Sequence, residues 1–351
     1  STRTGRGTMA RIRLADVAAA AGVSPSTASL ALNDPTARVA QATRDHVRRT
    51  AEEIGYRPNS LARGLRLQRT STIGLISDQI ATTPFAGLMI KGAQDAARER
   101  GNMVLLVDTE ADGETEREAI RALADRQVDA MVYACMWHQE LPAPEGLAPE
   151  SVMLNCRDVQ GRHPSVVPDE IQGASLGVEE LVAAGHRRIA MISCDEDVVA
   201  APLRLQAYRA VLSRHGIAID ERWVREVPIS AAGGEQGIRE LLDLPEEVRP
   251  TGVFCFNDRI AVGAMNAARR LGIDIPRDLS IVGFDDQPFL AADQDPPLTT
   301  VALPHQEMGE WAIRRLLDPP ADADRGAGGD GEVCRMPCRL VRRSTVAPPS
   351  R

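Results

Sequence analysis

Residues 14–33, LADVAAAAGVSPSTASLALN, decide how the amino-terminal part of this chain folds. Apolar residues recur at helical spacing from Leu14 onward and predict a first helix with one apolar face. Gly22 supplies the backbone conformation that ends this helix, and Ser24 and Pro25 provide the N-cap and first residue of a second. Two short helices joined by a tight, glycine-containing turn are typical of a helix-turn-helix, whose second helix enters the DNA major groove. An ordinary helical corner is the alternative that this stretch leaves open.

The second helix is expected to bury Ala28, Ala31 and Leu32. The residues that it is expected to expose are Pro25, Ser26, Ser29, Leu30 and Asn33. A third helix is predicted over 43–54 and ends at Gly55, while residues 1–10 lack periodicity and are expected to be disordered. Pro58 can begin a further short helix, which Gly64 makes unstable in isolation.

The charges are divided unevenly along the chain. Residues 1–70, called the head here, hold twelve arginines and five acidic residues, whereas the whole chain has a net charge of -8. The rest of the chain, residues 71–351, is called the body here. A basic head on an acidic body favours binding to DNA through the head alone. A solvated basic segment is the alternative explanation of the same charges.

Several other classes of protein lack support in the sequence. No apolar run is long enough for a membrane span, and the basic first residues precede no apolar signal-peptide core, so we expect a cytoplasmic protein without a membrane partner. The six cysteines lie in mostly apolar surroundings and are expected to be buried free thiols. Cys334 and Cys338 have no second pair to complete a zinc site, so we expect no metal and no cofactor.

The head resembles that of the LacI/GalR family of transcription regulators. The matching pattern is V-A-x-x-A-G-V-S-x-x-T-x-S-x-x-L-N, then V-x-x-x-T-R, then G-Y-x-P-N-x-x-A-x-x-L. Its residues in this sequence are Val17, Ala18, Ala21, Gly22, Val23, Ser24, Thr27, Ser29, Leu32, Asn33, Val39, Thr43, Arg44, Gly55, Tyr56, Pro58, Asn59, Ala62 and Leu65.

The resemblance implies a set of DNA-binding residues and a role for most of them. The set is Ser24, Pro25, Ser26, Thr27, Ser29, Leu30, Asn33, Thr43, Tyr56, Asn59, Ala62 and Leu65. Five of them are implied to bind phosphates: Ser24, Thr27, Ser29, Asn33 and Thr43. Pro25, Ser26 and Leu30 are implied to face base edges. Residues 58–66 match the family's hinge helix, whose Leu65 is implied to wedge into the minor groove, although it could instead be a linker leucine packed on the body.

The head departs from the family pattern at two positions. The family commonly has a serine that caps the third helix where Ala40 stands, and often an arginine where Leu30 stands. Pro25, Ser26 and Leu30 offer a single hydroxyl for reading bases, so specificity is expected to depend on thymine methyl groups and on DNA deformability.

The body alternates apolar runs of strand length with amphipathic helical segments. The predicted strands are 73–76, 104–107, 130–133, 152–154, 189–192, 253–256 and 280–284. The predicted helices lie around 86–100, 114–126, 171–184, 203–215, 234–244, 258–271 and 305–317. This alternation predicts parallel sheets covered on both faces, and the number of units suits two doubly wound subdomains.

The predicted fold is therefore a small all-α helix-turn-helix head with a hinge helix, followed by an α/β core of two doubly wound parallel-sheet subdomains. The resemblance implies that this core is similar to periplasmic sugar-binding proteins. The predicted boundaries are a disordered N-terminus at 1–10, a helix-turn-helix domain at 11–57, a hinge and linker at 58–70, a core at 71–345 and a tail at 346–351. Within the core, the first subdomain is expected at about 71–167 and 300–330, and the second at about 168–299 and 331–345.

Polar side chains that follow the predicted strands are the candidates for a ligand site, because ligands of such folds bind at the carboxyl ends of strands. Carboxylates, an amide, guanidinium groups and one stacking ring suit a sugar. The candidates are Asp78, Phe85, Arg157, Asp169, Arg204, Asn257 and Asp285. Each can also be a cap or a salt bridge: Asp169 precedes a predicted helix that it can cap. The family often has an aromatic wall for the ligand near Ile229, and this chain does not.

One enzyme motif competes with this interpretation. Residues 173–177, GASLG, fit the G-x-S-x-G nucleophile elbow, so an α/β hydrolase-like enzyme using Ser175 is a distant alternative. The elbow requires a strand directly before the serine, whereas Ser175 lies in a helical pattern. We therefore expect no enzyme.

The sequence predicts a homodimeric transcription regulator, a repressor, that binds double-stranded DNA at a near-palindromic operator. A small-molecule effector in the core cleft, expected to be a sugar, would release it from DNA. A nucleoside- or nucleobase-responsive regulator, or a global regulator of the same family, is the alternative.

Overall fold

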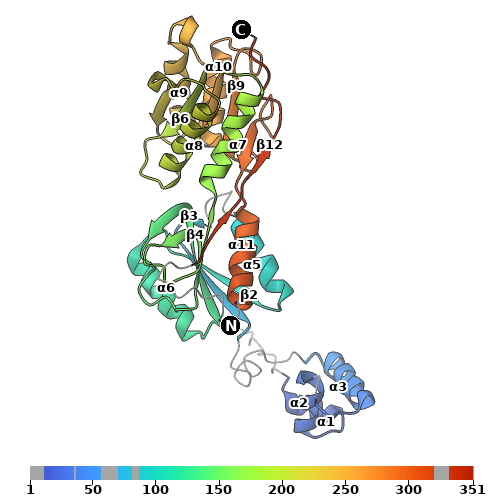
Figure 1. Cartoon of the computed structure of the whole chain (residues 1–351). Helices are drawn as coiled ribbons and strands as arrows, with labels where there is room; N and C mark the ends of the chain where they lie inside the picture. The colour runs from blue at the N-terminus through green and yellow to red at the C-terminus, as the bar shows by residue number, and fades with distance from the viewer. Residues whose placement is uncertain (1–11, 35–36, 57–69, 81–86, 320–331, 351) are drawn as a thin grey trace, which may run out of the picture. The chain divides into compact units, whose positions relative to one another are not determined.

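The computed structural model describes residues 12–34, 37–56, 70–80, 87–319 and 332–350. The chain forms two compact units, Ser1–Ser71 and Thr72–Arg351 (Figure 1). Within the described ranges, no helix is both long enough and apolar enough to cross a lipid bilayer.

The first unit is a three-helix cluster. Its helices are α1 (Leu14–Ala20), α2 (Pro25–Asn33) and α3 (Gln41–Glu53). Val17, Ala28 and Val47 contribute one buried residue from each helix to a shared core. Gly22, in the turn between α1 and α2, has a φ of 65°, the left-handed conformation that favours glycine. The three predicted helices are confirmed, each within two residues of its expected start.

The second unit contains two six-stranded sheets, which are parallel except where β12 joins β10. The first sheet has the order β11 (Val333–Met336), β5 (Ser165–Pro168), β4 (Val152–Asp158), β3 (Ala130–Leu141), β1 (Thr72–Ser77) and β2 (Met103–Asp108). The second has the order β12 (Arg339–Val341), β10 (Thr299–Ala302), β9 (Ser280–Asp285), β8 (Gly252–Cys255), β6 (Ile189–Cys194) and β7 (Val224–Val227). The α/β class and the two parallel sheets are confirmed.

Helices cover both faces of each sheet, because successive strand side chains point to opposite faces. Around the first sheet, Leu75 packs toward α5 (Gly87–Glu99) and α11 (His305–Leu317), while its neighbour Ile76 packs toward α6 (Gly113–Asp125). Around the second, Ile192 packs toward α9 (Ala231–Leu242) and α10 (Asp258–Arg270). Met191 packs toward α7 (Glu170–Ala183) and α8 (Ala200–Arg214). Two short 3₁₀ turns, Glu221–Trp223 and Glu246–Val248, complete the described elements.

The chain passes between the two sheets three times, and two of the passages differ from the predicted boundaries. β10 lies in the second sheet, so residues 300–302 belong there and not in the first subdomain. β11 pairs with β5 in the first sheet, with Val333 opposite Ser165, so residues 333–336 do not belong to the second subdomain. Sheet membership depends on which strand edge accepts the backbone hydrogen bonds, which the local sequence of a four-residue strand does not encode.

Candidate functional site

The second helix of the head begins as the sequence predicts. Ser24 is extended (φ -67°, ψ 152°), and its Oγ accepts a hydrogen bond from the Thr27 amide at 3.1 Å. Pro25 occupies the first turn, where its missing N–H leaves no helical bond unmade. The hydroxyls of Ser26 and Thr27 lie 2.9 Å and 2.8 Å from Ser24 Oγ, so three hydroxyl groups gather at this end of the helix.

The outer face of α2 is exposed at the positions predicted to face DNA bases. Pro25 and Ser26 are exposed, and Leu30 keeps 38% of its surface accessible. Ser29 and Asn33 are half-buried, so their predicted full exposure is wrong. The amide nitrogen of Asn33 donates to the Ser29 carbonyl at 3.1 Å, which turns this side chain back along its own helix.

The remaining predicted DNA-binding residues fall into two groups. Thr43, in the first turn of α3, and Tyr56, after its end, are half-buried, and Tyr56 packs against the helix cluster. Asn59, Ala62 and Leu65 lie outside the described residues, as does the whole proposed hinge helix.

Arg44 has a role that the sequence did not reveal. It is 6% exposed, and its guanidinium donates to the carbonyls of Ala31 (3.1 Å), Asp34 (2.8 Å) and Ala37 (3.1 Å). The last carbonyls of a helix have no partner within it, so this one side chain satisfies the end of α2 and the loop that follows. Arg44 therefore fixes α2 against α3 from within the head.

The start of α3 lacks a side-chain cap, as the departure at Ala40 predicts. Ala40 has the extended conformation of an N-cap residue (φ -57°, ψ 139°) but accepts no hydrogen bond through its side chain. Replacing Ala40 by serine is therefore expected to stabilise α3 by about 1 kcal/mol, since a serine Oγ there can accept a first-turn N–H. Hydrogen exchange of the α3 amides in the full chain measures the gain.

Ala42→Ser is the matched control for Ala40→Ser, because Ala42 is an exposed residue inside the first turn of the same helix. Serine is a poorer helix former than alanine, so this variant is expected to exchange faster by the equivalent of about 0.5 kcal/mol. Equal protection in the two variants would contradict the capping argument.

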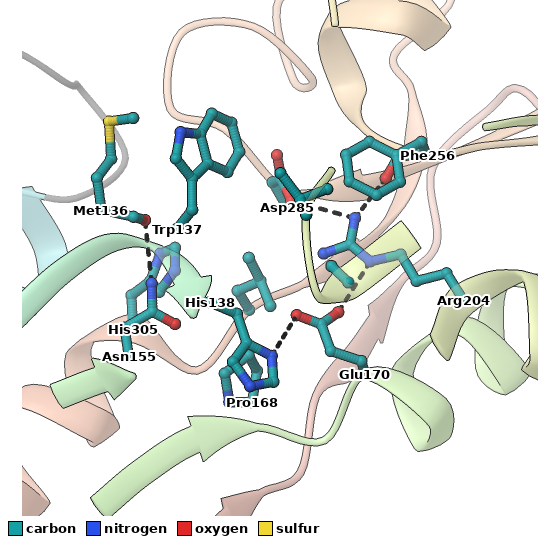
Figure 2. Close-up of a pocket in the computed structure, with 13 residues that line it drawn as sticks. Met136, Trp137, His138, Asn155, Pro168, Glu170, Arg204, Phe256, Asp285 and His305 are labelled. Atoms are coloured by element: carbon teal, nitrogen blue, oxygen red, sulfur yellow. Dashed lines mark hydrogen bonds and ion pairs between the residues drawn. The ribbon is translucent and has the colours of Figure 1, made fainter. Parts of the chain in front are cut away.

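In the second unit, a small cavity lies between the two sheets, with side chains from both around it (Figure 2). Its volume is only about 20 Å³, room for about one water molecule. The residues that line it are Met136, Trp137, His138, Asn155, Pro168, Glu170, Val198, Ala200, Arg204, Phe256, Asp285, Leu303 and His305. As described, the cleft is filled by the protein's own side chains.

Arg204, from α8, is at the centre of the polar contacts in this cleft. It is 3% exposed, its Nε donates to Glu170 Oε2 at 2.8 Å, and its Nη1 donates to the Phe256 carbonyl at 2.5 Å. The guanidinium also lies over two aromatic rings, 3.6 Å from the centroid of Phe284 and 4.5 Å from that of Phe256. Arg204, predicted from the sequence, is thus placed at the cleft, with its donors largely engaged by the protein.

Two carboxyl groups flank Arg204, and their environments differ. Burial of Glu170 favours its protonated form, but its interactions with Arg204 and His138 together outweigh burial and lower the pKa of Glu170 to about 2. Asp285 is also buried and lies farther from the guanidinium, at 3.9 Å. Burial therefore dominates and raises the pKa of Asp285 to about 6, with the Arg204 attraction opposing it only in part. The site thus holds one firmly ionised carboxylate and one that titrates near neutral pH.

Three residues that the sequence analysis did not select come from one irregularity in β3. Ala134 is paired with Leu154, but the next pair is Gln139 with Cys156, so β3 bulges over residues 135–138 opposite a single residue of β4. That single residue is Asn155, which has a φ of 57° and donates from Nδ2 to the carbonyls of Cys135 and Met136, both at 3.0 Å. The bulge brings Met136, Trp137 and His138 to the cavity.

The side chains of the bulge reach toward the second sheet. Trp137 packs against the apolar cluster of the second subdomain. His138 Nδ1 lies 3.4 Å from Glu170 Oε1, a distance typical of an ion pair but without hydrogen-bond geometry. Within the described residues, Nδ1 of His138 and Oδ1 of Asn155 are buried with no hydrogen-bond partner. Such orphaned atoms point to a ligand or water.

Four predicted site residues do not line the cavity. Asp78 accepts from the Met136 amide at 2.8 Å, and Arg157 pairs with Glu140 at 3.4 Å. Asp169 caps α7 by accepting from Gln172 N at 3.0 Å, and Asn257 caps α10 by accepting from Ile260 N at 3.0 Å. Asp169 and Asn257 are thus caps and Arg157 is in an ion pair, the structural alternatives for these residues, whereas Asp78 supports the backbone of β3. Phe85 lies outside the described residues.

Asn257 retains one feature of a ligand residue. It is fully buried, and its Nδ2 is without a hydrogen-bond partner in the described part of the chain. Its neighbour Asp258 accepts from Thr300 Oγ1 at 2.6 Å and from Gln287 N at 2.7 Å. Burial, together with the nearby Asp285 charge, raises the pKa of Asp258 well above its ordinary value.

The hydrolase alternative fails on geometry. Ser175 lies inside α7, and its Oγ donates to the Ile171 carbonyl at 2.7 Å, one turn earlier. The strand before it, β5, ends at Pro168, so no strand runs directly into the serine as a nucleophile elbow requires. Among the described residues, no group of histidine, cysteine, aspartate and glutamate could hold a metal ion. All six cysteines are free thiols, and all but Cys334 are buried.

Comparisons with known proteins agree with this architecture. Residues 13–59 match the bacterial regulatory proteins of the lacI family, and residues 178–346 match a periplasmic binding protein-like domain. The chain is 34% identical to the HTH-type transcriptional repressor CytR of Escherichia coli (strain K12), over 95% of this chain and 96% of that protein.

Solved structures give the same result. The lac repressor dimer bound to operator and the anti-inducer ONPF is 27% identical, with a TM-score of 0.75, over 96% of this chain and 100% of that one. The complex of the transcriptional regulator CelR with cellobiose is 28% identical, with a TM-score of 0.58, over 95% of this chain and 100% of that one. Together with the CytR match along nearly the whole sequence, these likenesses establish that the chain belongs to the lacI family of bacterial regulatory proteins.

Proposed function

We propose that this protein is a transcriptional repressor that binds a near-palindromic operator as a homodimer and leaves it when a small molecule occupies the cleft of the core. The observation that carries the proposal is the Ser24-capped α2, whose exposed face lies in a unit that matches the family's DNA-binding domain. The basic charge of residues 1–70 supports phosphate binding by that unit. Such a repressor works in the cytoplasm, where the DNA is.

The exposed residues divide the recognition task. Pro25, Ser26 and Leu30 face the base edges in the major groove, with Leu30 available for thymine methyl groups. The helix is positioned on phosphates by the hydroxyls of Ser24 and Thr27, together with Ser29, Asn33, Thr43 and Tyr56. Asn59, Ala62 and Leu65 belong to the hinge, with Leu65 as a minor-groove wedge. Arg44 contributes indirectly, by holding α2 at its angle to α3.

Selection of bound sequences from random duplex DNA by the full-length protein tests the DNA-binding proposal. The wild type is expected to enrich a near-palindrome. Leu30→Ala is expected to relax the preference at one position in each half-site, at a cost of about 1 kcal/mol or more there. Leu271→Ala, which truncates a leucine that is 47% exposed on the core, is the matched control and should leave the selected sequence unchanged.

Enrichment of no sequence by the wild type would refute sequence-specific binding. Unchanged enrichment with Leu30→Ala would leave specific binding intact but remove Leu30 from the base-reading face.

For the effector, the composition of the cleft favours an uncharged polyhydroxy compound, a sugar. Glu170 and Asp285 can accept hydrogen bonds from hydroxyl groups, and the donors of Arg204 and His138 can be redirected to a ligand. Trp137 supplies a flat face from β3, in place of the aromatic wall that is missing near Ile229. A nucleoside is the second candidate, since its ribose offers the same vicinal hydroxyls.

The effector would act by shifting the equilibrium of the protein from the state that binds the operator to a state that binds the effector. A cavity of about 20 Å³ does not hold a monosaccharide, so effector binding requires its lining, which comes from both subdomains, to move apart. The shift in DNA affinity is limited by the difference between the effector's affinities for the two states.

A thermal-shift screen of pentoses, hexoses and nucleosides, followed by titration of the operator complex with each compound that binds, tests this mechanism. Compounds that raise the melting temperature are expected to weaken operator binding in the same rank order. If compounds that stabilise the protein leave operator affinity unchanged, effector release is wrong, although repression by DNA binding alone would stand.

A further inference from the structure

A second cavity lies at the amino ends of strands of the second sheet, whereas the effector cleft lies at their carboxyl ends. Its volume is about 430 Å³, within the range of small-molecule sites. Its lining comes from residues just before three adjacent parallel strands: Arg188 before β6, Arg249 before β8 and Leu279 before β9. The effector cleft is at the carboxyl ends of these strands, so the two cavities lie at opposite ends of the same sheet.

One part of the lining of this cavity is apolar. It is formed by Leu242 at the end of α9 together with Pro250, Ile273 and Leu279. Ile273 and Leu242 are half-buried, so part of their apolar surface is open to the cavity. A ligand with an apolar body gains free energy by covering that surface.

Two half-buried arginines also line the cavity, Arg188 and Arg249. Arg188 Nε donates to the Arg249 carbonyl at 2.8 Å, which places the two residues next to each other. Arg249 Nη2 donates to the Leu244 carbonyl at 3.2 Å, while its Nε is buried without a partner. Both guanidiniums bond backbone carbonyls, and neither forms an ion pair with a carboxylate among the described residues.

The third arginine of the cavity contrasts with these two. Arg277 is exposed and lies 3.4 Å from Asp274 and 3.3 Å from Asp278, so its charge is balanced at the rim. The lining as a whole holds three arginines and two carboxylates, Glu246 and Asp278, and the two guanidiniums without an ion pair among the described residues are those of Arg188 and Arg249. A guanidinium in such a position recognises carboxylate or phosphate oxygens.

We propose that this cavity is a second binding site, which takes a small organic anion with a carboxylate or phosphate group and an apolar body. The anionic group binds between Arg188 and Arg249, and the apolar body covers Leu242 and Ile273. Because the site opens at the amino ends of the strands, its ligand does not compete with an effector in the cleft. The proposal does not depend on the identity of that effector.

Calorimetric titration of the full-length protein in chloride buffer, at fixed ionic strength, tests the site with three probes. Benzoate and phenyl phosphate carry an anionic group on an apolar body, and benzyl alcohol has the body without the charge. Both anions are expected to bind with one site per chain, and benzyl alcohol at least about tenfold more weakly.

Arg249→Gln and Arg188→Gln are each expected to weaken the binding of both anions at least about tenfold. Arg209→Gln is the matched control, since Arg209 is an exposed arginine of the same subdomain, paired with Glu221 at 2.8 Å. Thermal unfolding of each variant identifies any loss of folding, and two separate arginine variants guard against one of them failing to fold.

Three outcomes would overturn the proposal. The first is that neither anion binds the wild type. The second is that folded Arg249→Gln and Arg188→Gln bind as the wild type does. The third is an equal loss in Arg209→Gln, which would show a general charge effect and not a site.

Discussion

Arg204→Met is expected to lower the free energy of unfolding of the core by about 3–5 kcal/mol, because it leaves the buried Glu170 carboxylate without its cation. Methionine approximates the length of the arginine stem, so the loss of charge contributes more than a cavity does. The two aromatic rings that the guanidinium lies over would also lose a cation–π partner. Denaturant unfolding at pH 7 measures the change.

The dependence on pH gives this prediction a second signature. In the wild type, the pKa of Glu170 is about 2, below its ordinary 4.5, so its ionised form contributes stability above pH 4.5 that is lost as the pH falls toward 2. Without Arg204, only His138 opposes burial, the largest single influence, so the pKa of Glu170 is expected to rise above 4.5. Stability in the variant is then lost as the pH rises through that raised pKa, so the deficit relative to wild type should be largest at pH 7 and should shrink as the pH falls toward 2.

Two further variants separate this explanation from others. Arg342→Met is the matched control, since Arg342 pairs with Glu180 at 2.9 Å through a side chain that is 72% exposed, and exposed pairs contribute about 1 kcal/mol at most. Glu170→Gln combined with Arg204→Met should recover most of the loss, because no unpaired charge remains buried. A loss in Arg204→Met that is constant between pH 4 and 7, or that the double variant does not reduce, would show that packing and not charge is responsible.

The expected loss of stability also makes Arg204 variants unsuitable as the only test of the effector site. Arg204 was selected as a ligand residue, but its Nε and Nη1 donors already bind Glu170 and the Phe256 carbonyl. A loss of induction in an Arg204 variant would therefore mix ligand binding with core stability. Trp137 is a cleaner probe of ligand contact, because it is a half-buried residue of the cleft that carries no charge.

The three helices of the head could be predicted because their signals are local. The N-cap at Ser24 and the turn at Gly22 each depend on neighbours within a few residues, and the structure places both as expected. The role of Arg44 could not be predicted in the same way. Its acceptors lie 7 to 14 residues earlier in the chain and become its partners only once α2 and α3 have packed.

In the core, the long apolar strands and the helices between them were predictable, whereas four short strands were not. β5, β7, β10 and β11 have four residues each and lie near or at a sheet edge or a crossing between the sheets. Unlike the equally short β8, these four lack a continuous apolar run, and four residues give too little alternation to separate such a strand from a loop. Their pairing is decided by the rest of the sheet.

The cleft was predictable only in part, for a related reason. Arg204 and Asp285 follow recognisable patterns, and both line the cavity. Trp137 and His138 reach it through a bulge that depends on the register between β3 and β4, and the sequence predicted β3 only as far as residue 133. Asn155 was adjacent to the selected Arg157, but its left-handed backbone conformation, which determines which side chain faces the bulge, is set by that same register.

The helices α5 and α11 pack so closely that two glycines at their contact, Gly92 and Gly309, have no room for a side chain. The two helices lie side by side in Figure 1, although α11 follows α5 by some two hundred residues. A methyl group on Gly309 would be 2.1 Å from the Met89 carbonyl oxygen, and one on Gly92 would be 2.0 Å from that of Gln306. Both obstacles are backbone atoms within helices, so neither can move without moving its helix.

Gly309→Ala is therefore expected to lower the free energy of unfolding of the core by about 3 kcal/mol, near the upper end for overpacking, even though alanine is the better helix former. Gly113→Ala, in the first turn of α6, is the matched control: its new methyl group would meet only the flexible end of Arg117, at 3.8 Å, and the variant should be no less stable than wild type. Adding Gly92→Ala to Gly309→Ala should cost less than it does alone, because one outward shift of α11 relieves both contacts.

The same shift should be detectable at the cleft. α11 begins at His305, which lines the cavity, so displacing the helix moves a cavity residue. The intrinsic fluorescence of Trp137 and Trp311 in Gly309→Ala, compared with variants lacking either tryptophan, reports that displacement from the cleft and from α11 itself. Wild-type stability together with unchanged fluorescence would mean that the two helices do not meet at Gly309. A stability loss with unchanged Trp137 fluorescence would confine the damage to the α5–α11 contact, and the proposed coupling of helix packing to the cleft would be wrong.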